Sequence, residues 1–190
     1  MIFNQPEIRT LFHEMRNVDF AKKYSEAIDV SQPGLFMGNG VLFIGQNPGY
    51  LKPDRVPSDA ILSDKNTSDE VFHEAYKQSQ MSWKFYDFIK LLIDNSLDFS
   101  IINPCFFPTT GNQIPSCELI EACSPYFLKA IDLINPKVIV CLSSVAKIEL
   151  KAHEIDKKYK VVYSYHYAYL YRQSKEFVDA EIKKIKDALK

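Results

Sequence analysis

Four short, continuous apolar runs constrain the fold of this chain more than any other feature. They are VLFIG (41–45), FSIIN (99–103), KVIVCL (137–142) and KVVYSYH (160–166). Apolar runs without polar alternation are typical of strands that are covered on both faces. Strands that alternate with helices indicate a parallel sheet between two helical layers. We therefore predict one domain, residues 1–190, with a three-layer α/β/α architecture and a central four-stranded parallel sheet.

The segments between these runs predict helices and two long loops. The helices are one or two over 6–27, two pieces over 68–94, one from Ser116 to about Ile134, one from the Ser143–Ser144 caps, and one over 174–190. Each contains apolar residues at helical spacing, and several begin at a serine that can cap the first turn. Residues 31–40 predict a turn-rich loop, and 46–67 predict a long polar loop of the kind that is often functional.

Composition narrows the class of protein. Lys and Arg number 23 against 24 Asp and Glu, a net charge of −1, which excludes a protein coated in positive charge but allows a local basic groove. The start of the chain lacks a basic segment followed by an apolar run, and no apolar run approaches the roughly 18 residues of a membrane span. We therefore expect a cytoplasmic monomer that does not contact a membrane.

Four cysteines occur, and none forms a C-x-x-C pair. They are Cys105, Cys117, Cys123 and Cys141. This spacing indicates neither a disulfide scaffold nor a zinc knuckle. We predict that all four are small buried hydrophobic side chains.

Unusual loops follow the four predicted strands. GQNPGY follows the first, NPCFFPTTGN the second, SSVA the third, and the fourth ends in HYAYLYR. Ligands of parallel sheets bind at the carboxyl ends of the strands, so these loops could line one pocket. Asn47, Asn103 and His166 each have an ordinary interpretation as a turn residue, a turn cap and a surface histidine. At the ends of three strands of one sheet they form a candidate site.

The same loops carry a family resemblance, which covers about residues 41–172. Eight residues follow one continuous family motif: Asn103, Gly111, Asn112, Pro115, Glu118, Cys123, Pro125 and Tyr126. The register continues through INPKVIVCLSSVA (134–146) and His166–Arg172. The chain resembles the uracil-DNA glycosylase superfamily, closest to its iron–sulfur branch (family 4), whereas GQNPG is similar to the mismatch-specific and single-strand-selective members.

The sequence also departs from the pattern of the iron–sulfur branch at the positions of the cluster ligands. Phe107 stands where that branch has a cluster cysteine, and its N-terminal cysteine pair corresponds to positions near Val18 and Ala21. Only Cys123 of the four ligands remains, and one thiolate does not hold such a cluster. We predict no iron–sulfur centre, no other metal and no cofactor.

What the resemblance implies for catalysis can be assigned to single residues. His166 would stabilise the leaving uracil anion through a hydrogen bond to O2, and Asn47 would orient the attacking water. Asn103 would read the Watson–Crick edge of uracil through its amide. The remaining substrate-binding candidates are Gly45, Gln46, Pro48 and Gly49, with Trp83 or Phe85 either stacking on the flipped base or serving as helix core.

The last motif suggests DNA contacts. Tyr169, Leu170 and Arg172 are candidates for wedging into the duplex and for phosphate contact. Tyr167 and Ala168 replace the Pro-Ser pair with which the family pinches the phosphate backbone. The resemblance implies a monofunctional DNA glycosylase that hydrolyses the N-glycosidic bond of uracil, or of another deaminated base, in base excision repair. The alternative is a weak or inactive superfamily member that binds nucleic acid or a nucleobase.

Overall fold

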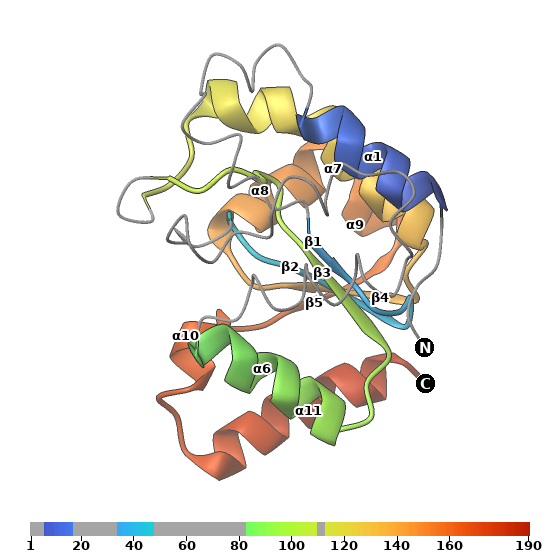
Figure 1. The fold of residues 1–190 in the computed structure, drawn as a ribbon. Coiled ribbons are helices and arrows are strands. Elements are labelled where there is room, and N and C mark those ends of the chain that lie inside the picture. Colours follow the sequence, from blue (N-terminus) through green and yellow to red (C-terminus); the bar gives the residue numbers. More distant parts are fainter. Residues whose placement is uncertain (1–5, 17–33, 48–82, 110–112) are drawn as a thin grey trace.

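A five-stranded sheet lies between two layers of helices in the computed structural model, which describes residues 6–16, 34–47, 83–109 and 113–190 (Figure 1). The strands are β1 (Gly34–Phe36), β2 (Val41–Ile44), β3 (Phe99–Ile102), β4 (Val138–Cys141) and β5 (Lys160–Tyr163), in the order β1-β3-β2-β4-β5. The strands β2 to β5 are the four predicted ones, and all their pairings are parallel. The predicted α/β/α architecture is confirmed.

The predicted strand count is wrong by one, because β1 adds an antiparallel edge strand. Gly34 pairs with Ile102, and Phe36 pairs with Ser100. The strand has only three residues within the segment predicted as a loop. The buried hydroxyl of Ser100 accepts a hydrogen bond from the Met37 amide at 3.2 Å and donates one to the Gly38 carbonyl at 2.5 Å. Partners more than sixty positions away thus hold this strand, and local sequence carries no sign of them.

The turn after β1 wraps around one carboxylate. Asp98 accepts hydrogen bonds from the amides of Asn39 at 3.2 Å and Gly40 at 2.9 Å. A Cβ at Gly38 would overlap the same carboxylate, so this close approach requires glycine. The turn places the start of β2 against the start of β3.

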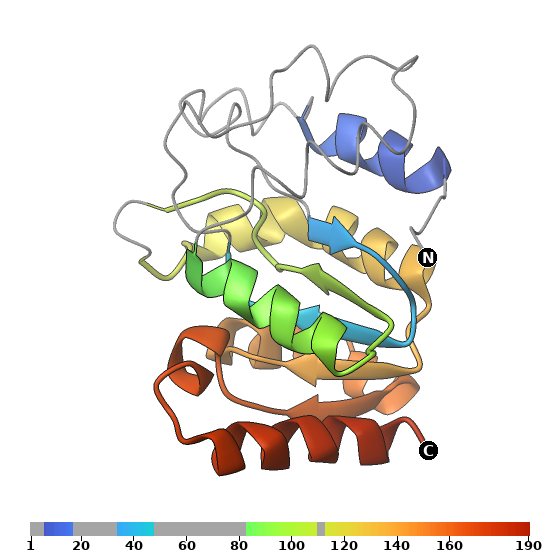
Figure 2. The ribbon, with the colours of Figure 1, turned by 60° about the horizontal axis from the view of Figure 1, so that its bottom comes forward.

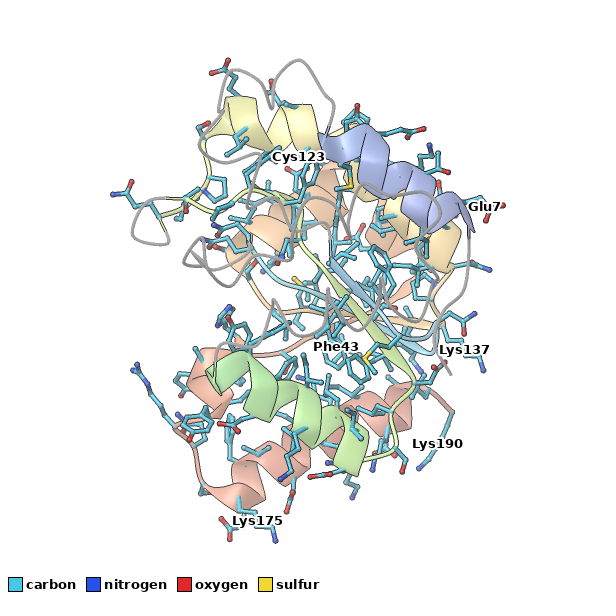
Figure 3. All side chains as sticks on the ribbon, in the orientation of Figure 1. Glu7, Phe43, Cys123, Lys137, Lys175 and Lys190 are labelled. Carbon is cyan, nitrogen blue, oxygen red and sulfur yellow. The ribbon has the colours of Figure 1, made fainter. Side chains whose placement is uncertain are left out.

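Two helical layers cover the sheet (Figures 1 and 2). We call α1 (Pro6–Arg16), α7 (Cys117–Ile134), α8 (Ser144–Ala152) and α9 (Ile155–Lys158) the upper layer, and α6 (Trp83–Asp94), α10 (Tyr167–Leu170) and α11 (Lys175–Ala188) the lower layer. Each layer packs its own apolar core against one face of the sheet. Phe43 lies in the lower core and Cys123 in the upper one (Figure 3).

The predicted helix starts agree closely with the structure. Ser116, Ser143 and Ser174 cap α7, α8 and α11, and each side chain accepts a hydrogen bond from an amide of the first turn. The short helices α9 and α10 were not predicted, and α10 lies in the HYAYLYR segment. The predicted helical residues 17–27 and 68–82 lie outside the described residues.

The four cysteine thiols are free, and three of them are buried as predicted. Cys117 is an exception, because it is exposed at the first position of α7. At the first position of α7, the Cys117 side chain lies outside the row of buried residues, which begins at Leu119. No helix in the described ranges is long and apolar enough to cross a bilayer.

Candidate active site

The ends of β2 and β3 meet at Gly45 and Asn103. The Gly45 amide donates to the Ile102 carbonyl at 3.0 Å, which continues the ladder one residue beyond β2. A Cβ built on Gly45 would overlap the side-chain oxygen of Asn103. The Asn103 amide therefore lies directly against the Gly45 backbone, as the predicted convergence requires.

Asn47 is held by the loop that follows β3. Its Nδ2 donates to the Thr109 hydroxyl at 3.0 Å, and its Oδ1 accepts from Gln46 Nε2 at 3.0 Å. The Thr109 hydroxyl donates its own proton to the Gln113 carbonyl at 2.5 Å, so it faces Asn47 as an acceptor. This chain of bonds orients the amide of Asn47 with its NH₂ toward Thr109 and its oxygen toward Gln46.

His166 follows β5 and caps α10. Its Nδ1 accepts a hydrogen bond from the Ala168 amide at 3.3 Å, so Nδ1 carries no proton. Burial lowers the pKa of His166 from its ordinary value of 6.5. The ring is therefore neutral at neutral pH, and its single proton lies on Nε2. His166 is a neutral hydrogen-bond donor at the carboxyl edge of the sheet.

Ser143, which follows β4, is bonded to the Gly45 loop. Its hydroxyl donates to the Gly45 carbonyl at 2.7 Å and accepts from the Ala146 amide at 3.0 Å. Because β4 lies between β2 and β5, the strand that precedes His166 is two strand spacings, roughly 10 Å, from the strand that precedes Gly45. A ligand that touches both His166 and the Gly45 loop must lie across the end of β4. The serines after β4 signalled a helix cap, but their sequence did not reveal the bond to Gly45.

Four other candidates have mixed outcomes. Pro48, Gly49 and the side chain of Trp83 lie outside the described residues. Phe85 is half-buried on α6, and its ring packs edge-on against Tyr167 at 5.6 Å between centroids. This contact favours the core interpretation of Phe85 over stacking on a substrate base.

The three DNA-contact candidates differ in exposure. Tyr169 is 47% exposed, and Arg172 is exposed. Leu170 is only 5% exposed and packs in the lower core. A wedge must stand free of the protein to enter a base stack, and Leu170 does not in this conformation; its DNA contact stays a prediction. The cause of its burial is α10, whose helical turn directs Leu170 inward.

Tyr167 also points into the lower layer. Its ring stacks on Phe88 at 5.7 Å between centroids with an interplanar angle of 28°. Burial raises the pKa of its hydroxyl above the usual value. An aromatic anchor, rather than a rigid proline, thus fixes the chain after His166.

A pocket of about 320 Å³ opens next to this anchor, between α6, α10 and α11. Its lining is mostly apolar, with Phe88, Leu91 and Val178, and also includes the charged Asp87 and Lys175. None of Asn47, Asn103 and His166 lines it. It is a feature of the lower layer and separate from the strand-end site.

A serine, a histidine and a glutamate also meet in the upper layer. The Ser124 hydroxyl lies 2.8 Å from His153 Nε2, and Glu149 lies 3.5 Å from the same nitrogen. A catalytic triad needs the carboxylate on the opposite ring nitrogen, so this cluster lacks the required geometry. It connects α7 with the end of α8.

Comparison with known proteins decides the family. The model of the uracil DNA glycosylase superfamily matches residues 37–190, which include every described strand except β1. The chain belongs to the uracil DNA glycosylase superfamily. It is also 32% identical over 96 residues to the type-4 uracil-DNA glycosylase of Archaeoglobus fulgidus. That match covers 40% of this chain and 48% of the archaeal protein, so the chain spans about half the length of that relative.

Superfamily members of the iron–sulfur branch hold their cluster with four thiolates, and the residues here do not fit such a group. Phe107, at one ligand position, is 1% exposed and packs against Phe106. Cys123, at the remaining ligand position, is a buried thiol. The described residues contain no group of three His, Cys, Asp or Glu side chains placed to hold a metal. Val18 and Ala21, near which the family's N-terminal cysteine pair would lie, are outside the described residues.

Proposed function

We propose that this superfamily member hydrolyses the N-glycosidic bond of uracil, or of another deaminated base, in DNA. The observation that carries the proposal is the state of His166. Its ring is neutral, and because Nδ1 accepts from Ala168, the single ring proton lies on Nε2. A neutral donor can hydrogen-bond the developing base anion and costs less to bury than an imidazolium.

The reaction requires three events at this site. A base within a duplex is inaccessible, so the nucleotide first leaves the stack. The bond between the sugar carbon and the base nitrogen then breaks, and its electron pair remains on the base. Water adds its oxygen to the sugar cation and loses a proton, and the base anion takes up a proton, which leaves a neutral free base and an abasic sugar. His166 stabilises the departing anion, and Asn47, fixed by Thr109 and Gln46, orients the water.

Asn103 supplies the selection of the base. One amide can donate to O4 of uracil and accept from its N3–H. Cytosine presents the reverse pattern of donor and acceptor, so its edge would leave buried groups unpaired, which discriminates strongly. The contact with Gly45 holds this amide in place at the end of β3.

A second candidate function has its own observation. Leu170 is buried, and Tyr167 and Ala168 stand where the family has its Pro-Ser pair. A protein without the pinch and the wedge can bind nucleic acid or a nucleobase without breaking the bond. We keep this non-catalytic binding protein as the alternative.

The deciding experiment measures release of free uracil from an oligonucleotide with a single uracil. The protein is prepared from a host that lacks its own uracil glycosylase, because trace contamination would imitate activity. Uracil is detected by mass spectrometry, and the abasic site by alkaline cleavage of the strand. A panel with hypoxanthine, xanthine and mismatched uracil identifies the base.

His166→Ala, purified in the same way, is the matched control. Release by the wild-type protein and loss in the variant would support the proposal. Binding without release from any base would favour the second candidate.

Action on DNA, a cytoplasmic location and a monomeric state remain part of the proposal.

A further inference from the structure

Two exposed tyrosines form a ready-made aromatic stack beside His166. Tyr165 and Tyr169 are each 47% exposed, and their rings stack at 5.0 Å between centroids with an interplanar angle of 26°. Phe177 of α11 packs against both rings, at 5.4 Å and 6.3 Å. We call Tyr165 and Tyr169 the tyrosine pair. Because a third ring supports it, the pair is organised before any ligand arrives.

The tyrosine pair has a fixed position relative to the candidate catalytic histidine. Tyr165 directly precedes His166, and the Tyr169 amide donates to the His166 carbonyl at 2.8 Å. Both rings therefore lie within a few residues of the group assigned to the leaving base. A base stacked on the pair would belong to a nucleotide close to the one in the site.

Basic and acidic side chains both lie around the tyrosine pair. From Ser164 to Lys175 the chain carries Arg172 and Lys175 and no Asp or Glu. Two carboxylates are bonded to this segment: that of Glu176 to the Ser174 side chain, and that of Glu181, which accepts from the Ser164 hydroxyl at 2.6 Å. Lys184 lies 3.5 Å from the same carboxylate and offsets its charge.

We propose that the tyrosine pair is a stacking platform for an unpaired base next to the excised nucleotide, and that the protein therefore prefers single-stranded DNA. Exposed aromatic side chains with basic residues nearby, here Arg172 and Lys175, are the usual surface for unpaired bases, since every base has a π-face. Bases inside a duplex already have neighbours on both faces. The side chain that would open a duplex, Leu170, is buried in the lower core. The platform rests on the proposed function only for the identity of the excised nucleotide.

The test measures binding rather than cleavage. Fluorescence anisotropy gives the Kd of a short labelled single strand with one 2′-fluoro-deoxyuridine, which resists hydrolysis. Tyr169→Ala should weaken binding about 5- to 100-fold, the range for loss of one stacked base, whereas Tyr169→Phe keeps the ring and the affinity. Tyr163→Ala is the matched control, because Tyr163 is 42% exposed but faces Lys147 of α8 in the upper layer. It should bind as the wild type does.

A second set of oligonucleotides identifies the stacked partner. Strands that lack the base on one side of the uracil analogue remove the platform's ligand and leave the phosphates. One of these strands lacks the base that would stack on the tyrosine pair. The wild type should bind that strand as weakly as Tyr169→Ala binds the complete strand. Tyr169→Ala should lose nothing further on it. Circular dichroism and thermal unfolding of each variant exclude a folding defect as the cause.

Three results would overturn the platform. They are equal or tighter binding of the corresponding duplex by the wild type, equal loss by Tyr169→Ala on complete and base-deleted strands, and unchanged binding by Tyr169→Ala. The outcomes are separable from those of the glycosylase assay. If uracil is never released but the binding pattern holds, the catalytic proposal fails and the platform stands. If Tyr169→Ala binds and releases uracil as the wild type does, the platform fails alone.

Discussion

Gly45→Ala is the sharpest perturbation that the strand-end site offers. The new Cβ would occupy the space of the Asn103 side-chain oxygen. The backbone cannot move aside easily, because the Gly45 amide is bonded to Ile102 at 3.0 Å and its carbonyl to Ser143 at 2.7 Å. The Asn103 amide must therefore rotate away from its position against Gly45. The substitution moves the Asn103 amide, the proposed base-reading group, and leaves its chemical structure unchanged.

The size of the expected loss in kcat/KM follows from the hydrogen bonds to uracil that the rotated Asn103 amide would no longer make. An unpaired buried partner costs about 1–3 kcal/mol, so kcat/KM for uracil should fall about 5- to 150-fold. The fold should be nearly unaffected, because replacing glycine by alanine in a compatible backbone contributes about 0.4–1 kcal/mol of stability, which offsets the rearranged side chain. Single-turnover uracil release and thermal unfolding measure the two quantities separately.

A double-mutant cycle tests the cause. Asn103→Ala removes the oxygen that the new Cβ would meet, so Gly45→Ala should add no further loss of activity in that background. Additive losses would mean that Gly45 acts on the substrate through another route. Full activity of the Gly45→Ala single variant would refute the assignment of base reading to Asn103.

Four further predictions concern His166, Leu170 and the cluster position. His166→Ala should lower single-turnover release by roughly 10²–10³-fold and change the Kd for a non-cleavable strand far less; equal losses would make His166 a docking residue. Because burial lowers the pKa of His166 below 6.5, the unfolded chain binds the proton first as the pH falls. The free energy of unfolding, measured in urea, should therefore decrease as the pH falls from about 6.5 to the lower pKa of the folded state. The decrease should be smaller in His166→Asn, whose side chain can still accept a hydrogen bond as the cap of α10. Leu170→Ala should destabilise the fold by about 2–4 kcal/mol in urea unfolding, as for a core leucine, whereas an exposed wedge would lose almost nothing. The purified protein should be colourless and contain no stoichiometric iron by elemental analysis, since Phe107 provides no ligand atom; a visible absorption band with bound iron would contradict this.

The sheet and most helix starts could be predicted from the sequence because local patterns determine them. In β2, β3 and β4 all four residues are buried, which is why each is a continuous apolar run. Ser116 and Ser143 cap their helices with their own side chains, so a single residue marks each start. The strand β1 is different, because it depends on Ser100 and Asp98, which lie far away in the chain.

Within the candidate site, the meeting of strand ends was predictable, but the internal bonds were not. Parallel topology places the residues after each strand at one edge, and this brings Gly45 and Asn103 together. The orientation of Asn47 depends on Thr109, which the motif did not single out. The exposure of Cys117 was also missed, because position relative to the helix end, rather than residue type, decides it.

The segment after His166 shows how one substitution redistributes roles among its neighbours. An aromatic ring at position 167 gains a stacked partner in Phe88, which attaches the chain to α6 and to the lower core. With that anchor in place, residues 167–170 form the single helical turn of α10, and Leu170 packs inward. Tyr169, one position earlier on the same turn, is left outside against Tyr165. The helical turn that buries Leu170 therefore also leaves the flat ring of Tyr169 at the surface, where the proposed platform lies.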